Sequence, residues 1–517
     1  MNEVPWLTLL TFTPLVGGLA VIALGPRRAA MAQRLALGVA TLVLALTVLV
    51  GSRFDAASGT LQFVERHAWI QALGVNYHLG VDGLGLLMIV LTGLLVPMAM
   101  LASWRLGERA SLYFGLMLWL EAGLLGTFTA LNFFHWFLFW ELSLVPAFFL
   151  IKLWGGRESS AAAVQFFVYT MVGSVAMLLG FLAVYLAVGT FDFVELAELG
   201  ARDGLTAGFA QRLAGTGLPA GVLTTAVFLA VFLGLAVKVP LMPFHTWLPA
   251  TYAEAPTGVT MLLTGAMSKM GVYGFLRLLL PIFPESLRAW QGPLLGLAVL
   301  TILFSAAAAF AQRDLKRLLA YSSINHLGYC LLGVFAVATT ASGTGRLAQE
   351  SAAALNGVLL QMFNHGLTAA TLFCFVGWIE QRAGGLRGLD DFGGLRRVAP
   401  VLTGLMGIAL FSSLGLPGLN GFVGEFLIFK GSFGLAPWAT VGATGGLLLT
   451  AVFLLTLSQR VFHGPLNPRW QALPDLSATE RWIVAPATAL MFLVGLYPQS
   501  VLGFTNETVK RWVALLP

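Results

Sequence analysis

Apolar runs of about twenty residues recur along almost the whole chain, and no other feature of the sequence constrains the fold as strongly. A helix of that length crosses the hydrocarbon core of a bilayer, which is about 30 Å thick. Of the 517 residues, 58% are hydrophobic and only 10% are charged, as expected for a protein dissolved in a lipid bilayer. About fourteen runs are long enough to span it. They are centred near Leu15, Leu44, Leu91, Glu121, Pro146, Val175, Leu229, Gly265, Ala306, Leu332, Thr368, Leu414, Leu449 and Met491. The sequence therefore predicts an all-α polytopic membrane protein.

Lysine and arginine are distributed unevenly among the loops between these runs. Most of them follow odd-numbered spans: Arg27, Arg28, Arg34, Arg105, Arg109, Lys152, Arg157, Arg313, Lys316, Arg317, Arg382, Arg387, Arg396, Arg397, Arg460, Arg469 and Arg481. By the positive-inside rule these loops are cytoplasmic, and both termini lie outside a bacterial inner membrane or a thylakoid-type membrane. Arg53, Arg66, Lys510 and Arg511 lie on the opposite side, so the bias is strong without being complete.

The remaining polar segments are short. No basic segment precedes the first apolar run, so we expect a retained span rather than a cleaved signal peptide. Segments 51–80 and 191–219 are expected to form outside loops, the second with a short surface helix at 194–205.

Composition also excludes several classes of function. The net charge is +6, but the positive charges are scattered between apolar runs rather than gathered on one polar face, which argues against a nucleic-acid partner. The two cysteines, Cys330 and Cys374, lie in apolar runs and are too few for a disulfide framework, an iron–sulfur cluster or a structural zinc site. We therefore expect no redox centre in this protein.

Several ionisable residues lie well inside the apolar runs, where a charge costs roughly 2.5–3.5 kcal/mol on insertion scales. They are Glu121, Glu141, Lys238, Lys269, His326, His365 and Glu425, with His135 nearer the end of its run. Any one of them could be a locally paired structural residue or a snorkelling side chain. Acids, bases and histidines spread over successive helices are, however, the groups that a proton relay requires.

Two of these residues adjoin helix breaks. Lys238 ends an apolar helix that starts near Leu223, and the following Pro240 and Pro243 remove backbone donors. The carboxyl end of that half-helix favours a cation whereas burial favours the neutral form, so neighbours decide the protonation of Lys238. The second break is Gly-Leu-Pro-Gly-Leu-Asn-Gly at 415–421, and Glu425 is expected in the first turn of the half-helix that resumes, where a carboxylate is favoured.

The breaks lie in spans seven and twelve, five spans apart. Broken helices at corresponding places in two halves point to a transport site, and an odd repeat length inverts the second repeat. We expect two inverted five-helix repeats, spans four to eight and nine to thirteen. The predicted units are 1–110, 111–282, 283–465 and 466–517, which hold helices one to three, the two repeats, and helix fourteen with its tail. The alternative is a pair of proline kinks without function.

The other buried groups also have two interpretations. Lys269 lies near the middle of its span, so snorkelling would need a water-filled cavity, and we favour a relay role. Glu141 lies among aromatic residues and needs a cationic partner, for which Lys238 is the candidate. His326 and His365 could be packing histidines, but the flanking hydroxyls and amides offer positions that also hold water.

Five motifs carry a resemblance to a known family. They are Phe-Trp-Glu-Leu-Ser-Leu-Val-Pro at 139–146, Lys-Val-Pro-Leu-Met-Pro-Phe-His-Thr-Trp-Leu-Pro at 238–249, Glu-Ala-Pro-Thr at 254–257, Asp-Leu-Lys-Arg-Leu-Leu-Ala-Tyr-Ser at 314–322 and Gly-Phe-Val-Gly-Glu-Phe at 421–426. Over nearly its whole length the sequence resembles the antiporter-like membrane subunits of respiratory complex I, the NADH:quinone oxidoreductase. It is most similar to their M type, also called subunit 4 or, in photosynthetic relatives, the D subunit. Glu425 replaces the lysine of the L and N types, and the long lateral helix of the L type is missing.

The resemblance implies fourteen helices, two inverted repeats and one proton channel. It also implies a modulated ion pair of Glu141 with Lys238, a central connector at Lys269, relay positions at His326 and His365, and a terminal site at Glu425. Glu121 matches a further acid of the family. NADH, FMN, iron–sulfur clusters and quinone would bind to other subunits, and the neighbours in the membrane would be L-type and N-type antiporter-like subunits.

Three functions follow as hypotheses. The leading one is a proton-translocating subunit of an NADH- or ferredoxin-driven quinone oxidoreductase, in which the Glu141–Lys238 pair drives a proton through Lys269 towards Glu425. The alternative is a subunit of a multi-subunit sodium/proton antiporter of the same fold. The third is a scaffold that only spaces other subunits, in which the buried charges would be dispensable. Asp82, His245 and Asp390 are assigned no transport role, and Pro256 and Pro417 are treated as structural.

Overall fold

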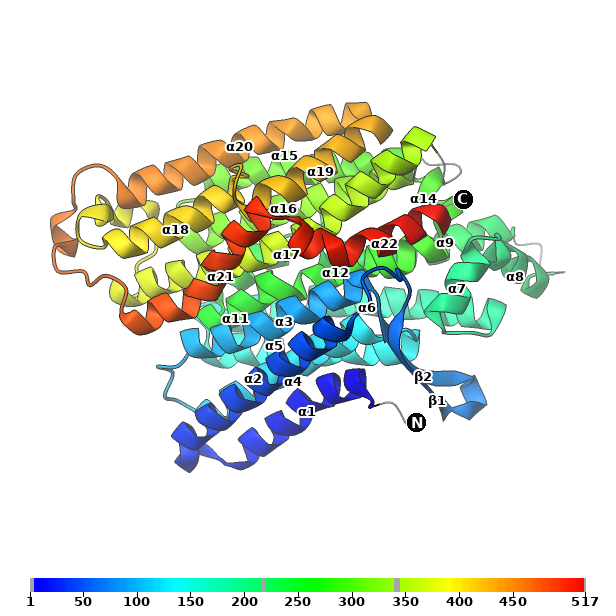
Figure 1. Ribbon diagram of the computed structural model, residues 1–517, viewed down its shortest axis with the longest axis horizontal. Helices are drawn as coiled ribbons and strands as arrows, with labels where there is room; N and C mark the ends of the chain where they lie inside the picture. Colours follow the sequence, from blue (N-terminus) through cyan, green and yellow to red (C-terminus); the bar gives the residue numbers. More distant parts are fainter. Residues whose placement is uncertain (1–3, 215–218, 339–344, 516–517) are drawn as a thin grey trace.

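The computed structural model describes residues 4–214, 219–338 and 345–515. Its helices lie roughly side by side along the long axis of the molecule (Figure 1). Among the described residues, twelve helices are long and apolar enough to cross a membrane. They are α1 (Trp6–Ala23), α2 (Ala29–Arg53, preceded by the 3-10 turn η1), α3 (Gly83–Ala102), α4 (Ala110–Thr129), α5 (Phe133–Trp154), α6 (Ser159–Val188), α9 (Ala220–Lys238), α15 (Gln291–Ala311), α16 (Leu315–Val337), α17 (Gly345–Arg382), α20 (Pro437–Phe462) and α21 (Ala478–Leu496).

The two other predicted spans are helical but interrupted. The run near Gly265 comprises α11 (Thr257–Leu262), the π-helical turn η3 (Leu263–Met267), α12 (Lys269–Gly274), the π-helical turn η4 (Phe275–Leu279) and α13 (Leu280–Ile282). The run near Leu414 comprises α18 (Pro400–Ser413) and α19 (Asn420–Leu435). All the predicted runs are therefore helical, and the prediction of an all-helical multi-pass membrane fold is confirmed.

The two ends of the bundle differ. The end that we call the arginine-rich end holds the connections after α1, α3, α5, α15, α17 and α20, where most of the basic loop residues lie. The end that we call the hairpin end holds β1 (Gln62–Ile70), β2 (Val75–Val81), α7 (Phe193–Gly200), α8 (Gly204–Arg212), α14 (Pro284–Ala289) and α22 (Gln499–Leu515). The first helix begins and the last helix ends at the hairpin end (Figure 1), as an even number of crossings requires.

The two polar segments contain more structure than the sequence predicted. Segment 51–80, expected to be a loop, forms an antiparallel hairpin whose backbone reverses at Gly74, a residue with a φ of 62°. The single helix expected at 194–205 is instead two helices, α7 and α8. They separate at Asp203, whose φ of 52° lies in the left-handed region and cannot continue a right-handed helix.

Polar residues fix where several of the helices begin. Asp82, Asn132 and Asp314 accept hydrogen bonds from the first backbone N–H groups of α3, α5 and α16. Ser477 and Glu480 form a reciprocal capping box at the start of α21. Such caps satisfy donors that have no partner inside the helix, each worth about 1 kcal/mol.

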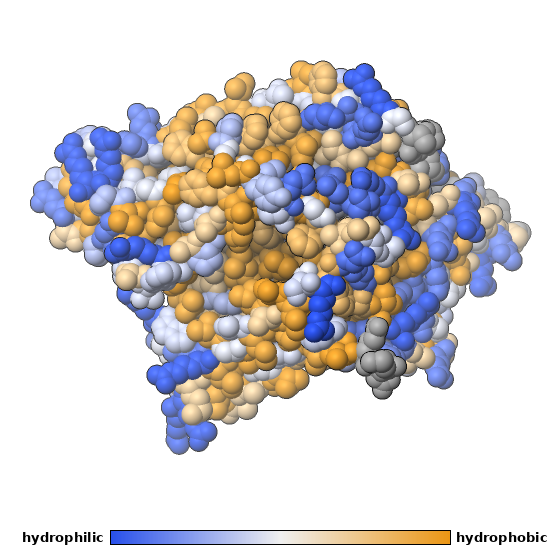
Figure 2. Space-filling model, in the orientation of Figure 1, coloured by the Kyte–Doolittle hydropathy of each residue, from blue (hydrophilic) through white to orange (hydrophobic). Residues whose placement is uncertain are grey.

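The face of the bundle drawn in Figure 2 is largely apolar between two polar ends. Trp482, Leu448 and Leu496 are 78%, 72% and 73% exposed, which suits contact with lipid or with other membrane proteins. In contrast, α16 is almost entirely buried, and so is the hydrophobic part of α17. Polar side chains on these two helices are therefore held inside protein rather than in lipid.

The hairpin is fastened to the bundle through Asp192, which caps α7. His78 Nδ1 on β2 lies 2.6 Å from Asp192 Oδ2, and Arg66 on β1 lies 3.5 Å from the same oxygen. Burial alone would raise the pKa of the Asp192 carboxyl. The hydrogen bond and charge of His78, with the N–H groups of Glu195 and Val194, outweigh burial and hold the pKa below its usual value of 3.8.

This lowered pKa predicts acid-sensitive anchoring of the hairpin. A carboxyl with a depressed pKa stabilises the fold above its ordinary pKa, and the stabilisation is lost as the pH falls through the folded-state value. We expect Asp192→Asn to increase protease cleavage within 62–81 at neutral pH. Below the folded-state pKa of Asp192, an acid-active protease should cleave the wild-type protein and the Asp192→Asn variant at equal rates. Equal cleavage rates of the two proteins at neutral pH would contradict the role of this charge.

A second buried ion pair joins α3 to the turn η4. Arg277 donates to Asp82 through Nη1 at 2.8 Å and Nη2 at 2.6 Å, so the contact is bidentate. The guanidinium also lies 5.5 Å from the ring centre of Tyr273 and 5.6 Å from that of Trp512 on α22. Asp82, which the sequence left without a transport role, thus has a structural one.

Loss of one partner from this pair should be costly. Arg277→Met leaves the Asp82 carboxylate buried without its counter-charge, and breaking a buried pair typically costs about 3–5 kcal/mol. We expect a clearly lowered midpoint in thermal unfolding of the purified protein. Lys510→Met, which removes an exposed pair with Glu507, should change stability by less than about 0.5 kcal/mol. Equal effects of the two substitutions would contradict this assignment.

Candidate functional site

Lys238 is the last residue of α9, as the sequence predicted, and the backbone leaves the helix at Pro240 and Pro243 before α10 (Trp247–Glu254) begins. The side chain is buried, and its Nζ lies 5.0 Å from the ring centre of Trp140. Trp140 in turn donates from Nε1 to Ser174 Oγ at 2.9 Å. A cation over an indole face is favourable when both are desolvated, so Trp140 is a neighbour of Lys238 that the sequence did not reveal.

Glu141 follows Trp140 on α5. Its carboxylate and Lys238 are close enough to interact electrostatically. Among the described residues, however, no nitrogen–oxygen contact of 4.0 Å or less joins them, and Glu141 Oε1 has no hydrogen-bond partner there. The direct ion pair expected from the sequence is therefore open in this structure.

Glu121 lies in the middle of α4 and is completely buried. Within the described part of the protein, neither of its carboxyl oxygens has a hydrogen-bond partner. A Cβ at Gly123 would lie 2.7 Å from the backbone nitrogen of Ser143, so α4 and α5 approach closely beside this acid. An unsatisfied buried polar group lowers the free energy of unfolding by about 1–3 kcal/mol. Burial of Glu121 without a partner therefore does not stabilise the fold.

Lys269 is held by the π-helical turn that precedes it. In η3 the N–H of Ser268 donates to Leu263 O, five residues back, and the widened turn leaves Thr264 O accessible. Lys269 Nζ donates to this carbonyl at 2.5 Å and to Ser268 Oγ at 3.3 Å. The side chain is 0% exposed, which is inconsistent with snorkelling. Single π-helical turns are frequent at functional sites.

From Lys269, polar contacts continue across three helices to Glu425. Lys269 Nζ lies 2.8 Å from His365 Nδ1 on α17. The rings of His365 and His326 are 5.2 Å apart between centres. On α16, His326 Nδ1 lies 3.1 Å from Glu425 Oε1, and its Nε2 lies 3.0 Å from Ser413 Oγ. The structure thus brings together Lys269, His365, His326 and Glu425 in one buried series.

The second break differs in one respect from the sequence prediction. Glu425 was expected in the first turn of the resumed half-helix, but α19 begins at Asn420, so Glu425 lies in its second turn. The N-terminal partial charge fades within the first turn and does not explain this carboxylate. His326 and Gln361, whose Nε2 donates to Glu425 Oε1 at 3.3 Å, are its stabilising partners.

Asn420 instead organises the helix start. Asn364 Nδ2 donates to Asn420 O at 2.5 Å, and Asn420 Oδ1 accepts from the hydroxyl of Ser412. Its own Nδ2 donates to Thr368 Oγ1 at 3.4 Å. These bonds tie the broken span to α17.

The partners on α17 were missed in the sequence although a signal was present. Gln361, Asn364, His365 and Thr368 follow one another at the spacing of a single helix face. The sequence analysis singled out His365 with its flanking amide, but it did not use the spacing of Gln361 and Thr368, because amides and hydroxyls in apolar runs are individually unremarkable. Their common face distinguishes them.

The segments that carry Lys238 and Lys269 pack closely against each other. A Cβ at Gly271 would lie 2.9 Å from the backbone nitrogen of Val239, so α12 packs directly against the break after Lys238.

Among residues 4–214, 219–338 and 345–515, no group of three or more His, Cys, Asp and Glu side chains is arranged to hold a metal ion.

Comparison of the sequence with known proteins identifies membrane proteins of one family. Residues 130–450 match the family described as NADH:quinone oxidoreductase/Mrp antiporter, transmembrane. Over 512 residues the chain is 36% identical to NADH-quinone oxidoreductase subunit M of Rhodobacter capsulatus, covering 98% of this chain and 96% of the relative. The chain belongs to the subunit M family of NADH-quinone oxidoreductase. Subunit M of Mycobacterium tuberculosis is 34% identical over 99% of this chain and 94% of its own length.

The folds of solved structures are consistent with membership in the subunit M family. A chain of respiratory complex I from Thermus thermophilus superposes with a TM-score of 0.84 at 28% identity, covering 99% of this chain and all of that one. A chain of the Mrp complex from Dietzia sp. DQ12-45-1b has a TM-score of 0.80 at 22% identity, which shows a shared fold. The resemblance drawn from the five sequence motifs is thereby confirmed.

Because Asn420 makes these contacts, we expect removal of its side chain to lower the free energy of unfolding. Asn420→Ala deletes the acceptor of Ser412 and the donor to Thr368, and leaves buried polar groups unpaired at about 1–3 kcal/mol. We expect a lower thermal unfolding midpoint of the purified complex that contains the variant subunit. Thr456→Ala, at a half-buried position on α20 whose hydroxyl bonds only to its own helix, is the control and should be near neutral. Unchanged stability of Asn420→Ala would show that other contacts hold the break.

Proposed function

We propose that this protein translocates protons as a membrane subunit of an NADH:quinone oxidoreductase, the multi-subunit respiratory complex I. The observation that carries the proposal is the buried series from Lys269 through His365 and His326 to Glu425. Each member binds and releases protons, and successive members lie within hydrogen-bonding distance or one ring contact of each other. Membership in the subunit M family supports this function.

The proposed mechanism couples the two halves of the protein through electrostatics. A change of charge in a neighbouring subunit alters the separation of Glu141 and Lys238, and in a medium of low dielectric this shifts the protonation of both. The altered charge at the end of α9 acts on Lys269, since α12 packs against the break beside Lys238. Lys269 then gives a proton to His365 Nδ1. Transfer between the two histidine rings requires a bridging water or a ring rotation, and Glu425 receives the proton from His326.

Several finer assignments belong to the same proposal. Residues 111–282 and 283–465 form the two inverted repeats, flanked by 1–110 and 466–517. The arginine-rich end faces the cytoplasm of a bacterial inner membrane, and both termini lie outside. L-type and N-type antiporter-like subunits are the neighbours, and NADH, FMN, iron–sulfur clusters and quinone bind to other subunits. Glu121 is a further relay acid.

A sodium/proton antiporter subunit is the second candidate. It is supported by the Mrp fold similarity, which rests on 22% identity, whereas the matches to subunit M reach 36% over nearly the whole chain. Sodium transport would also need a site rich in oxygen ligands, and the series consists instead of a lysine, two histidines and one carboxylate. The scaffold hypothesis leaves the cost of burying Lys238 and Lys269 unexplained.

The proposal is tested with Lys238→Ala in the assembled complex in sealed membrane vesicles. We expect the number of protons moved per electron to fall, because the charge that responds to Glu141 is lost. Proton uptake, NADH oxidation and subunit content are measured together. Lys152→Ala, at the exposed end of α5, is the matched control. A wild-type proton-to-electron ratio in Lys238→Ala would contradict the proposed function.

A further inference from the structure

The π-helical turn η3 leaves one backbone carbonyl for Lys269. In an α-helical turn, the N–H of Ser268 would donate to Thr264 O, four residues back. In η3 this N–H donates instead to Leu263 O at 3.0 Å. Thr264 O accepts from two side chains, Ser268 Oγ at 2.9 Å and Lys269 Nζ at 2.5 Å. The position of Lys269 Nζ therefore depends on which carbonyl accepts from the Ser268 N–H.

Tyr252 on α10 holds the carbonyl that takes this N–H. Its hydroxyl donates to Leu263 O at 3.0 Å, so this oxygen accepts from the tyrosine and from the Ser268 N–H together. A carbonyl oxygen has two lone pairs and can accept both hydrogen bonds. The Tyr252 side chain is 1% exposed, and its ring packs edge-on against Phe373 of α17 with 5.7 Å between ring centres. Close packing thus keeps the hydroxyl at Leu263 O.

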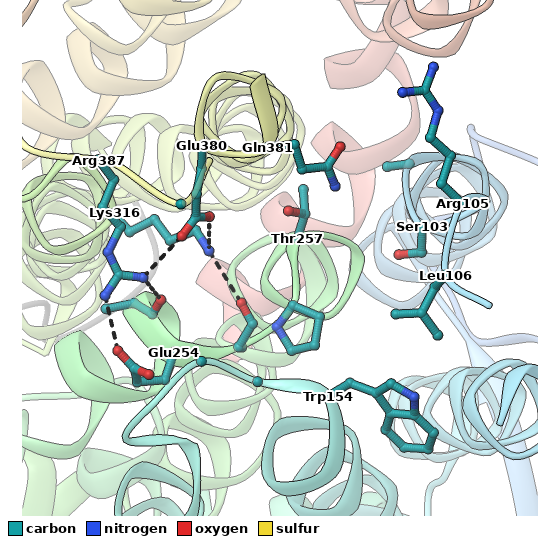
Figure 3. Close-up of a pocket in the computed structure, with 17 residues that line it drawn as sticks. Ser103, Arg105, Leu106, Trp154, Glu254, Thr257, Lys316, Glu380, Gln381 and Arg387 are labelled. Atoms are coloured by element: carbon teal, nitrogen blue, oxygen red, sulfur yellow. Dashed lines mark hydrogen bonds and ion pairs between the residues drawn. The ribbon is translucent and has the colours of Figure 1, made fainter. Parts of the chain in front are cut away.

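The helix that carries Tyr252 is fixed at both of its ends. At the start of α10, Trp247 Nε1 donates to Val237 O at 3.0 Å, near the end of α9. At its last residue, Glu254 Oε1 lies 3.0 Å from Arg387 Nη2, beside a cavity at the arginine-rich end of the bundle (Figure 3). These contacts make α10 a fixed support from which Tyr252 reaches the turn.

A separate contact fixes η3 to α16. Thr264 Oγ1 lies 3.1 Å from Ser323 Oγ, and Ser323 Oγ donates to Leu319 O at 3.0 Å. Because the single hydroxyl proton of Ser323 goes to Leu319 O, the Thr264 hydroxyl is the donor in the first contact. This contact holds the Thr264 side chain but does not choose between the two backbone patterns. Of the contacts described, only the Tyr252 hydroxyl acts on Leu263 O from outside the turn.

We infer that Tyr252 is a positioning residue for Lys269. By bonding to Leu263 O it keeps η3 in the π-helical form, in which Thr264 O holds the ammonium group. This inference rests on the proposed function and adds to it a residue that neither gives nor takes the transported proton. Without the Tyr252 hydroxyl, the turn returns to the α-helical pattern and a backbone N–H occupies Thr264 O. Lys269 Nζ then moves away from His365 Nδ1, its neighbour at 2.8 Å.

The inference is tested with Tyr252→Phe, which removes the hydroxyl and keeps the ring. Proton uptake, NADH oxidation and subunit content are measured on the assembled complex in sealed vesicles, beside Lys269→Ala. We expect normal assembly and a proton-to-electron ratio that falls by at least half of the loss caused by Lys269→Ala. Substitution of Tyr252 by 4-aminophenylalanine places an N–H donor where the hydroxyl is, and it should restore the wild-type ratio.

Tyr113→Phe is the matched control. It makes the same change at another fully buried tyrosine, on α4, whose hydroxyl lies 2.9 Å from Ser103 Oγ. This hydroxyl contacts neither η3 nor a relay group, so the control should keep the wild-type ratio. An equal fall in Tyr113→Phe and Tyr252→Phe would show a general effect of removing a buried hydroxyl, and would overturn the inference.

The second readout is the backbone of the turn itself. An electron-microscopy structure of the complex with Tyr252→Phe should show the Ser268 N–H at Thr264 O and Lys269 Nζ displaced from His365. A merely structural role of the tyrosine would lower stability without changing this hydrogen-bond pattern. An unchanged π-helical turn in the variant overturns the inference, whatever its proton-to-electron ratio.

The remaining outcomes separate the inference from the proposed function. A wild-type ratio in Tyr252→Phe, with a lowered ratio in Lys269→Ala, overturns the positioning role and leaves the proposed function standing. A wild-type ratio in both variants overturns the two together. If Tyr252→Phe does not assemble, 4-methylphenylalanine at this position replaces it, because it has the shape of 4-aminophenylalanine without the donor. Equal ratios with these two residues would contradict the inference.

Discussion

The fold depends on one constraint, which is that a buried polar group in a bilayer must find its partner within protein, because no water is available there. The second half of the protein meets this constraint by placing its polar residues on the inner faces of α16, α17 and α19, where lysine, histidine, amide and carboxylate groups contact one another. These groups are buried inside the bundle, and the face drawn in Figure 2 is largely apolar. The helix arrangement and the relay therefore have the same physical cause.

The first half meets the constraint incompletely. Glu121 has no hydrogen-bond partner for either oxygen within the described residues, and Glu141 has one oxygen without a partner. Lys238 lies over an indole ring rather than against a carboxylate. In the proposed function, the contacting groups of the second half pass the proton, and the open Glu141–Lys238 pair of the first half responds to charge placed beside it. The two halves thus differ in how their buried charges are partnered.

Much of the fold followed from the sequence, because hydrophobic runs, basic loops and proline breaks act over short distances. The end of α9 at Lys238 and the burial of Lys238, Lys269 and Glu121 inside their helices were predictable in this way. The hairpin was not, because the contact that fastens it to the bundle joins His78 to Asp192, which lie 114 positions apart. Gln361, a partner of Glu425, was also missed because it comes from a distant segment. The half-helix begins at Asn420, so Glu425 lies in its second turn rather than in the first. Lys269 was recognised as buried, but the π-helical turn that supplies its carbonyl partner has no clear signature in sequence.

The length of α17 has a mechanical consequence. Its 38 residues make a rod of about 57 Å, nearly twice the thickness of the hydrocarbon core. Asn356, near one end, accepts a hydrogen bond from Thr505 of the amphipathic helix α22, and Glu380, near the other, is held by Lys316 and Arg387. One continuous helix therefore joins the contacts of α22 on one side of the bundle to those of Lys316 and Arg387 on the other.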